Sequence, residues 1–437
     1  MPQDSELDQE EILKILKNDL GHEDFKLEEF KEKPASDSPL GFLGDHRKVQ
    51  VIVSVSGERQ TLFYFLKRMP TKVPQHLEYA VEVKAFYKEI ELYKTLFVDL
   101  KNGQADLQGS MTKWRPEYFY SRGSDVFVLE DVSLQGYYMY PERCLMDEDH
   151  MRPSLVAMAA MHAASIVFEV KFNQGKVKTV SPNKTGPFTK GQVTLGDMYG
   201  HLTFETEFSD KKGHLGHEFV EAGIRSQVEL SKLLTGYSTE EKIKIGEELP
   251  GVLRRVYQLV KPSDRFKNVF IHGDLWSNNL LYRKDKKGKV KDALIIDFQL
   301  ARYAPPAHDV MMFLYLSQDN TFLLENEKEM LKYYYTALSK ELQKNNLAVD
   351  TYLSWPNFIE SCEYYRDLGI IMRLFYFQLT LAPPELTTKI MNNPEEYMQS
   401  MMVDRTDMVL ESFNKDEMYR KRVTEALKEA IGKFILN

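Results

Sequence analysis

The residues with the clearest chemical potential form a polar loop in the C-terminal half of the chain. His272 and Asp274 follow a short apolar run, and Asn279 comes five residues after Asp274. Asp297 follows a second apolar run. Phosphoryl transfer needs a carboxylate that takes a hydroxyl proton and oxygen ligands for Mg²⁺. The spacing therefore predicts Asp274 as the catalytic base and Asn279 and Asp297 as ligands of Mg²⁺.

Each of these residues alone has an ordinary structural explanation. Asp274 could form an Asx turn, Asn279 could begin a strand, and Asp297 could belong to a turn. Their combination in the order strand, loop, hairpin and acid favours phosphoryl transfer. Two other classes stay open. One is a nucleotide-binding module without turnover, and the other is a metal-dependent hydrolase that uses His272, Asp274, Asp297, His308 and Asp309.

The same stretch resembles the protein-kinase-like clan, and in detail the ecdysteroid kinase-like family, which is related to choline kinases and aminoglycoside phosphotransferases. The matching segments are His272-Gly273-Asp274-Leu275-Trp276, Asn278-Asn279, Ile296-Asp297-Phe298-Gln299 and Pro306-Ala307-His308-Asp309. The resemblance extends from about Gly41 to Phe377. It implies a kinase that uses ATP and Mg²⁺ and phosphorylates a small-molecule alcohol.

Two features argue against a kinase that acts on proteins. Position 273 is Gly, where kinases regulated through an activation loop carry Arg. Asp309 follows Asp297 closely and opens an apolar helix, which leaves no room for a segment that displays a peptide. We expect Asp309 to be a helix N-cap that also holds the catalytic loop. His162 is expected to be a hydrogen-bonded core residue, and Trp276 either shapes the acceptor pocket or anchors the loop.

A cation for the ATP phosphates is expected in the N-terminal part. Lys67 and Arg68 end a predicted strand, and neighbours on a strand face opposite sides, so only one can point into the cleft. We predict Lys67. Its partner acid is expected on a predicted helix over residues 75–99. Glu82 and Glu89 both flank the apolar stripe of this helix, so helical geometry does not choose between them.

The resemblance decides between these two acids. The family's Phe-x-x-Glu-x-x-x-Tyr pattern is matched by Phe86, Glu89 and Tyr93, which implies Glu89.

The remaining nucleotide contacts depend on backbone groups. Gly41 and Gly44 predict a turn whose N–H groups lie near phosphate, although the segment departs from a G-x-G-x-x-G pattern. The resemblance implies that adenine meets the carbonyl of Glu130 and the N–H of Val132.

The periodicity of the chain predicts an α+β fold with two lobes. Period-two alternation indicates a strand near 49–55, and further strand-like segments follow at 60–67, 117–120 and 125–129. Helical periodicity indicates helices over 9–20 and 75–99. Beyond residue 135 helices dominate, including one over 395–413, with one strand pair at 280–283 and 293–296. We predict an ATP-binding lobe, 1–133, with an antiparallel sheet and one long helix, and a mainly helical lobe, 134–437, that carries the catalytic and acceptor-binding residues.

The composition limits the class of protein. The chain has 437 residues, 43% of them hydrophobic, and a net charge of −8, which disfavours nucleic acid as a partner. Only two cysteines are present and no signal-peptide core is visible, so we expect a cytoplasmic protein that does not insert into membranes. We also expect a monomer.

The acceptor is the least determined feature. The family resemblance implies an ecdysteroid or a related steroid or xenobiotic hydroxyl, and a choline- or ethanolamine-type substrate stays an alternative. Aromatic residues in the regions expected to form the acceptor wall are Tyr199, Phe204, Tyr364, Tyr365 and Tyr376. Ordinary core packing explains most of these rings equally well.

Overall fold

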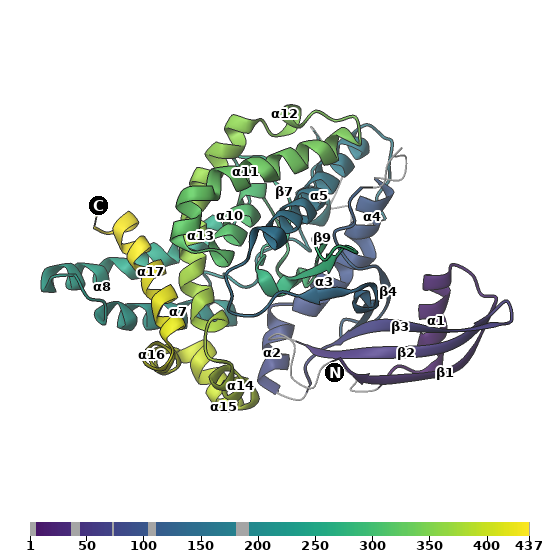
Figure 1. Cartoon of the computed structure of the whole chain (residues 1–437), viewed down its shortest axis with the longest axis horizontal. Helices are drawn as coiled ribbons and strands as arrows, with labels where there is room; N and C mark the ends of the chain where they lie inside the picture. Colours follow the sequence, from purple (N-terminus) through teal and green to yellow (C-terminus); the bar gives the residue numbers. More distant parts are fainter. Residues whose placement is uncertain (1–5, 36–43, 72–73, 104–110, 181–191, 437) are drawn as a thin grey trace.

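The computed structural model describes residues 6–35, 44–71, 74–103, 111–180 and 192–436. Figure 1 shows a sheet-containing part at one end of the molecule and a larger helical part at the other.

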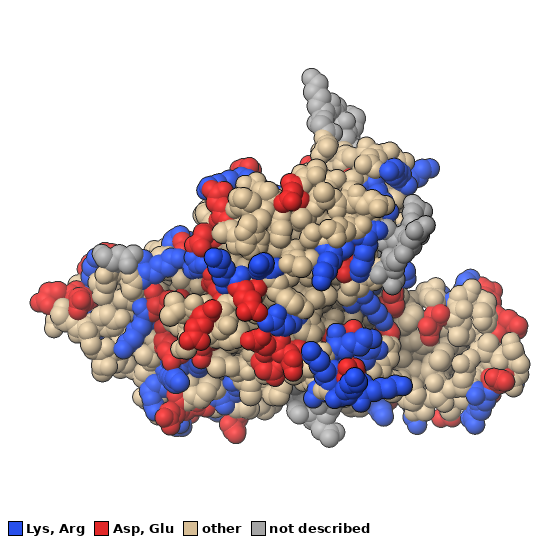
Figure 2. All heavy atoms as spheres, turned by 45° about the horizontal axis from the view of Figure 1, so that its top comes forward, with Lys and Arg blue, Asp and Glu red and all other residues tan. Residues whose placement is uncertain are grey.

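The two cysteines, Cys144 and Cys362, are not paired with each other. On the face shown in Figure 2, acidic and basic side chains are interspersed.

The smaller part is built on a five-stranded antiparallel sheet in the order β1-β2-β3-β5-β4. Its strands are β1 (Phe25–Pro34), β2 (Asp45–Val55), β3 (Glu58–Arg68), β4 (Tyr118–Arg122) and β5 (Val126–Glu130). Alternate side chains of β5 enter different cores. Val126 and Val128 pack with helix α1 (Gln9–Leu20), whereas Phe127 and Leu129 join the core shared with the larger lobe.

The single helix predicted over 75–99 is wrong. The chain forms α2 (Pro74–Glu82), α3 (Ala85–Glu91), a π-helical turn (Leu92–Leu96) and α4 (Phe97–Asn102). The break lies at Lys84, which has a left-handed backbone with φ of 54°. Because α2 packs against α15 (Pro394–Met398) while α3 packs against the turn after Asp297, tertiary contacts redirect the chain at this point.

The larger part is mainly helical, as predicted. Its other helices are α5 (Glu148–Asn173), α6 (Leu195–Tyr199), α7 (Leu215–Lys232), α8 (Thr239–Arg254), α9 (Val256–Leu259), α10 (Pro306–Ser317), α11 (Asn320–Gln343), α12 (Val349–Tyr352), α13 (Trp355–Thr380), α14 (Pro384–Asn392), α16 (Thr406–Lys415) and α17 (Glu417–Phe434). Two small sheets lie among them. One has the order β6-β8-β9, from β6 (Tyr137–Met139), β8 (Leu280–Lys284) and β9 (Val290–Ile295), and the other pairs β7 (Val269–Ile271) with β10 (Arg302–Ala304).

The helix predicted over 395–413 is also interrupted. Between α15 and α16 the chain makes a π-helical turn (Gln399–Val403) and then extends at Asp404. The buried guanidinium of Arg405 donates to the carbonyl oxygens of Ser400, Met401 and Phe219. A buried charge needs such acceptors, so the chain bends around Arg405 instead of continuing as one helix.

By length and composition, helix α5 is long and apolar enough to span a membrane. However, 78% of its most apolar 18-residue stretch is buried inside the protein. It packs against α11 and β9, as a central core helix does (Figure 1). The larger core runs from α3 and α4 through α5 into α13 and α17 without interruption. The bilobal α+β fold is confirmed, and the predicted lobe boundary at residue 133 falls between β5 and β6.

Candidate functional site

An ion-pair bridge joins the two lobes at the predicted phosphate site. The ammonium of Lys67, on β3, lies 2.7 Å from Oε2 of Glu89 and 2.7 Å from Oδ1 of Asp297. Oε1 of Glu89 accepts the N–H of Phe298 at 3.1 Å. Glu89 therefore fixes both the cation and the backbone directly after Asp297.

Burial shapes the charge of this bridge. It raises the pKa of Glu89 to about 7 against the opposing effect of the Lys67 charge. Burial alone lowers the pKa of Lys67, but the carboxylates of Asp297 and Glu89 outweigh it and hold the pKa above its ordinary value. The side chain of Asp297 is 28% exposed, compared with 5% for Lys67, so Asp297 is the member that a ligand can reach.

The rival residues point elsewhere. Arg68 faces the opposite side of the strand, where it donates to Glu32 at 3.1 Å. Glu82 accepts the N–H of Leu215 at the start of α7. The pairing of Lys67 with Glu89 is thus present in the structure, and their role in binding ATP stays a proposal.

The predicted catalytic loop, which runs from His272 to Asn279, is held by Asp309. Its two carboxylate oxygens accept the N–H groups of His272 at 2.7 Å and Gly273 at 2.8 Å, and His162 lies 3.2 Å away. The expected hold on the loop is present, and His162 is the buried, hydrogen-bonded residue that was expected. The expected N-cap role is wrong: α10 begins at Pro306, so Asp309 lies in its first turn and is free to face the loop.

Gly273 makes a close approach that a side chain would prevent. Its φ is +77°, and a Cβ atom there would lie 2.4 Å from the carbonyl oxygen of Leu300 and 2.6 Å from Nη1 of Arg302. Arg302 instead donates to the carbonyl of Gly273 at 2.7 Å and forms a buried ion pair with Glu205. The loop is therefore clamped on both its N–H and its carbonyl side.

Asp274 is buried and receives two side-chain hydrogen bonds. The hydroxyl of Tyr376 donates to Oδ1, and the amide of Asn279 donates to Oδ2 at 2.9 Å and to the main-chain carbonyl at 2.7 Å. Burial raises the pKa of Asp274 to about 7, although both hydrogen bonds act to lower it. A carboxyl group with this pKa can accept a proton near neutral pH.

The donor set around Asp297 fits Mg²⁺. The N–H of Ile296 donates to the carbonyl of Asn279 at 3.1 Å, which brings the two predicted ligands onto adjacent backbones. Because the amide nitrogen of Asn279 is committed to Asp274, its amide oxygen is the atom left for a cation. A carboxylate and an amide oxygen are hard ligands of the kind Mg²⁺ prefers. Among the described residues no group of three or more His, Cys, Asp or Glu side chains is arranged to hold a metal.

The structure describes three of the four residues whose backbone groups are predicted to contact nucleotide. Gly41 lies outside the described residues. Gly44 has φ of +132°, and a Cβ atom there would lie 3.4 Å from Cε of Lys67, so its backbone runs beside that side chain. Glu130 ends β5, and Val132 begins a short 3₁₀ helix where the chain leaves the sheet. Their contacts with adenine stay predictions.

A cavity of about 140 Å³ opens beside Asp274. Its lining includes Asp274 and Trp276 of the catalytic loop, and Trp276 packs edge-on against Tyr376 with ring centroids 6.4 Å apart. Of the other lining residues, Glu207, Gln299 and Thr380 are polar. The rest are apolar or aromatic, and they are Tyr79, Phe208, Phe219, Leu300, Phe375, Leu379, Met391, Tyr397, Met401 and Met402. Trp276 thus shapes the pocket.

Of the five aromatic residues expected in the acceptor wall, only Tyr376 lines this cavity. Tyr199 is buried against Asp99, Tyr365 packs against His308, and Tyr364 is 46% exposed. Sequence reasoning missed Glu207 and Tyr79, because nothing in their spacing relates them to the catalytic loop.

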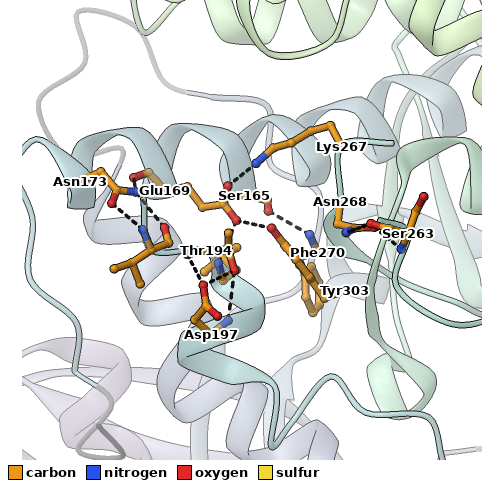
Figure 3. Close-up of polar contacts among 12 residues, drawn as sticks. Ser165, Glu169, Asn173, Thr194, Asp197, Ser263, Lys267, Asn268, Phe270 and Tyr303 are labelled. Carbon is orange, nitrogen blue, oxygen red and sulfur yellow. Dashed lines mark hydrogen bonds and ion pairs between the residues drawn. The ribbon is translucent and has the colours of Figure 1, made fainter. Parts of the chain in front are cut away.

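A polar network supports the strand that leads into the loop (Figure 3). Buried Glu169 of α5 accepts the hydroxyl of Tyr303 at 2.8 Å, the N–H of Leu195 at 2.8 Å and a charge-assisted bond from Lys267. Ser165 accepts the N–H of Phe270 in β7. Since Tyr303 lies in β10, the partner of β7, these bonds fix the strand end from which His272 and Asp274 emerge.

The fold and this site define a bilobal protein of the protein-kinase-like type. Residues 42–347 match the model of the ecdysteroid kinase-like family, which is more than half of the chain. The protein therefore belongs to the ecdysteroid kinase-like family, and the resemblance of its motifs to that family is confirmed. No curated protein is similar enough in sequence to count as a relative.

Solved structures give weaker likenesses. An ethanolamine kinase from Plasmodium vivax is 10% identical with a TM-score of 0.35, covering 92% of this chain and 84% of its own. A choline/ethanolamine kinase family protein from Mesorhizobium loti is 11% identical with a TM-score of 0.30, covering 90% and 94%. The GDP complex of an aminoglycoside 2′-phosphotransferase is 12% identical with a TM-score of 0.34, covering 96% of both chains. Scores of this size carry no argument about substrate.

Proposed function

We propose that the protein is an ATP- and Mg²⁺-dependent kinase that transfers the γ-phosphate to a hydroxyl group of a small molecule, with an ecdysteroid or a related steroid or xenobiotic alcohol as the favoured acceptor. The observation that carries the proposal is the position of Asp274 at a largely apolar cavity. A cavity of this kind suits a small organic alcohol.

The contacts of the individual residues support the following roles. Asp274 takes the proton of the acceptor hydroxyl. The hydroxyl oxygen forms a bond to the γ-phosphorus of ATP, and the bond from that phosphorus to the oxygen of the β-phosphate breaks. Lys67, oriented by Glu89, compensates the charge of the phosphates. Asn279 and Asp297 would hold Mg²⁺, which, when bound, neutralises charge on the phosphates.

The test is incubation of the pure protein with ATP, Mg²⁺ and a pooled panel of alcohols, followed by mass spectrometry for an added phosphate. The panel contains ecdysteroids, other steroids, phenols, glycosides, choline and ethanolamine. We expect a phosphorylated steroid or xenobiotic. Phosphorylated choline would instead assign the protein to the amino-alcohol kinases, and no product despite ATP binding would contradict the proposal.

Three variants separate the assigned roles. Asp297→Asn should abolish transfer because it removes a metal ligand without changing shape. Asp274→Asn should lower turnover by at least a hundredfold with little change in ATP affinity, since it acts on the acceptor side. Asp285→Asn, in the exposed tip of the β8–β9 hairpin, is the matched control and should behave as wild type. Near wild-type transfer by Asp297→Asn at saturating Mg²⁺ would overturn the metal assignment.

A further inference from the structure

Two of the residues that line the cavity are acids, Asp274 and Glu207, and none is Lys or Arg. Asp274 is assigned to the reacting hydroxyl, whereas the mechanism leaves Glu207 without a role. A carboxyl group is costly to place in a largely apolar cavity unless it has hydrogen-bond partners. Its presence there points to a ligand group that completes its hydrogen bonding.

The position of Glu207 is fixed from several sides. Its Oε2 accepts the hydroxyl of Tyr79 on α2, and its N–H donates to Glu205 at 2.7 Å. A Cβ atom on Gly216 would lie 2.2 Å from the carbonyl oxygen of Glu207, so the start of α7 packs directly against this backbone. The side chain is thus held in place before any ligand arrives, which is the arrangement of a preorganised binding group.

One carboxyl oxygen of Glu207 remains for a ligand. Tyr79 occupies Oε2, and the hydrogen bonds and ion pairs of the described residues give no partner to Oε1. Glu205, the neighbouring acid, is by contrast saturated by Arg302 and by the N–H groups of Glu207 and Phe208. Of these two acids, Glu207 is the one that lines the cavity.

We infer that Glu207 is a second anchoring point for the acceptor, where it accepts a hydrogen bond from a donor group other than the hydroxyl that is phosphorylated. The acceptor is then a largely apolar alcohol that carries a second donor, either a hydroxyl or an ammonium group. This inference rests on the proposed function, because it takes the cavity to be the acceptor site. It assigns specificity to Glu207, on the segment between α6 and α7.

The test is a binding comparison that needs no turnover. The probes are n-octanol, the octane diol with a hydroxyl at each end, and the amino-octanol with an amine at the far end. They are titrated against the full chain with Mg²⁺ and a non-hydrolysable ATP analogue. Binding is followed by the fluorescence of Trp276, which lines the cavity, and Trp276→Phe identifies its signal.

We expect the diol, the amino-alcohol or both to bind about tenfold tighter than octanol, as one hydrogen bond to a buried carboxyl group would give. Glu207→Gln should reduce the preference for the amino-alcohol to less than about twofold, because Tyr79 holds the amide oxygen and the NH₂ group then faces an ammonium, which can only donate. The hydroxyl of the diol can also accept a hydrogen bond from this NH₂ group, so the amino-alcohol is the probe that decides. Glu229→Gln, on the surface of α7 beside Lys232, is the matched control and should keep the preference.

Equal affinities of the three probes for the wild type, or a preference for the amino-alcohol that persists in Glu207→Gln, would overturn the inference. So would the absence of binding by all three. The comparison within the wild type needs no variant, so a misfolded Glu207→Gln does not affect it. If the donor preference is present but no alcohol is phosphorylated, the proposed function fails and the anchoring role of Glu207 stands; transfer without any preference gives the reverse result.

Discussion

Asp274 combines burial with two donated hydrogen bonds, and these act on its proton in opposite directions. Burial favours the neutral acid and raises the pKa to about 7, whereas the bonds from Tyr376 and Asn279 favour the carboxylate. The balance leaves a group that changes protonation state close to neutral pH. In the proposed reaction only the carboxylate can take the hydroxyl proton.

Kcat/KM should therefore rise with pH and level off above about 7. In Tyr376→Phe a bond that lowers the pKa of Asp274 is lost, so this pKa rises and the ascending limb moves to higher pH. At pH values on the ascending limb, kcat/KM of Tyr376→Phe should be roughly threefold to tenfold lower than that of the wild type. Initial-rate profiles between pH 5.5 and 9 measure this, with Tyr87→Phe on the exposed side of α3 as the control. A uniform loss of rate without a shift of the limb would contradict it.

At the level of elements, the catalytic loop is shaped by its neighbours. Asp309 of α10 accepts its N–H groups, and Arg302 of β10 donates to the carbonyl of Gly273. The loop begins at the end of β7, and the hydrogen bonds of Glu169 hold this strand end in place. Three separate elements thus determine where the carboxyl group of Asp274 lies.

Gly273→Ala should disrupt this arrangement. The new methyl group would meet the carbonyl of Leu300 at 2.4 Å, and φ of +77° disfavours any side chain. We expect a loss of about 2–4 kcal/mol in the free energy of unfolding, together with a large loss of activity. Urea denaturation followed by circular dichroism measures the first. Gly246→Ala is the matched control, because nothing lies within 4 Å of its added Cβ. An unchanged stability of Gly273→Ala would show that the loop can relax.

At the level of the whole molecule, the two lobes are joined by a shared apolar core and by an ion-pair bridge. Lys67 and Glu89 come from the smaller lobe and Asp297 from the larger one, so the ion-pair bridge is formed by side chains of both lobes. A nucleotide with its metal bound there would contact both lobes. Binding to the folded state alone raises the apparent stability of the whole chain.

ATP with Mg²⁺ should therefore raise the melting temperature more than ATP alone. At a ligand concentration of about a hundred times Kd the stabilisation is about 2.7 kcal/mol. Asp297→Asn should lose the increment that Mg²⁺ adds while keeping part of the effect of ATP, and Asp285→Asn should keep both. Differential scanning calorimetry measures these shifts. An increment from Mg²⁺ that survives in Asp297→Asn would place the metal on other residues.

Short-range patterns in the sequence were sufficient for much of the fold. Alternation along 49–55 predicted a strand that the structure contains as β2, in which Val49, Val51 and Val53 are buried and their neighbours are less so. The strand predicted over 60–67 is also present, as part of β3. The helix predicted over 9–20 is also present, with a capping box at Asp8 and Glu11. The break at Lys84 was not predictable, since it depends on contacts of α2 and α3 with segments distant in sequence. The bend at Asp404 depends in part on the distant carbonyl of Phe219, which accepts from Arg405.

By itself, the sequence determined the family and the bilobal class, and the resemblance of its motifs to the family implied Glu89 as the partner of Lys67, where periodicity alone left Glu82 open. Only the tertiary structure decided which side chains surround Asp274. Tyr376, Glu207 and Tyr79 come from α13, a connecting segment and α2, and no periodicity links them. A pocket is formed by packing between distant elements, so its lining, and with it the choice of acceptor, follows from the fold.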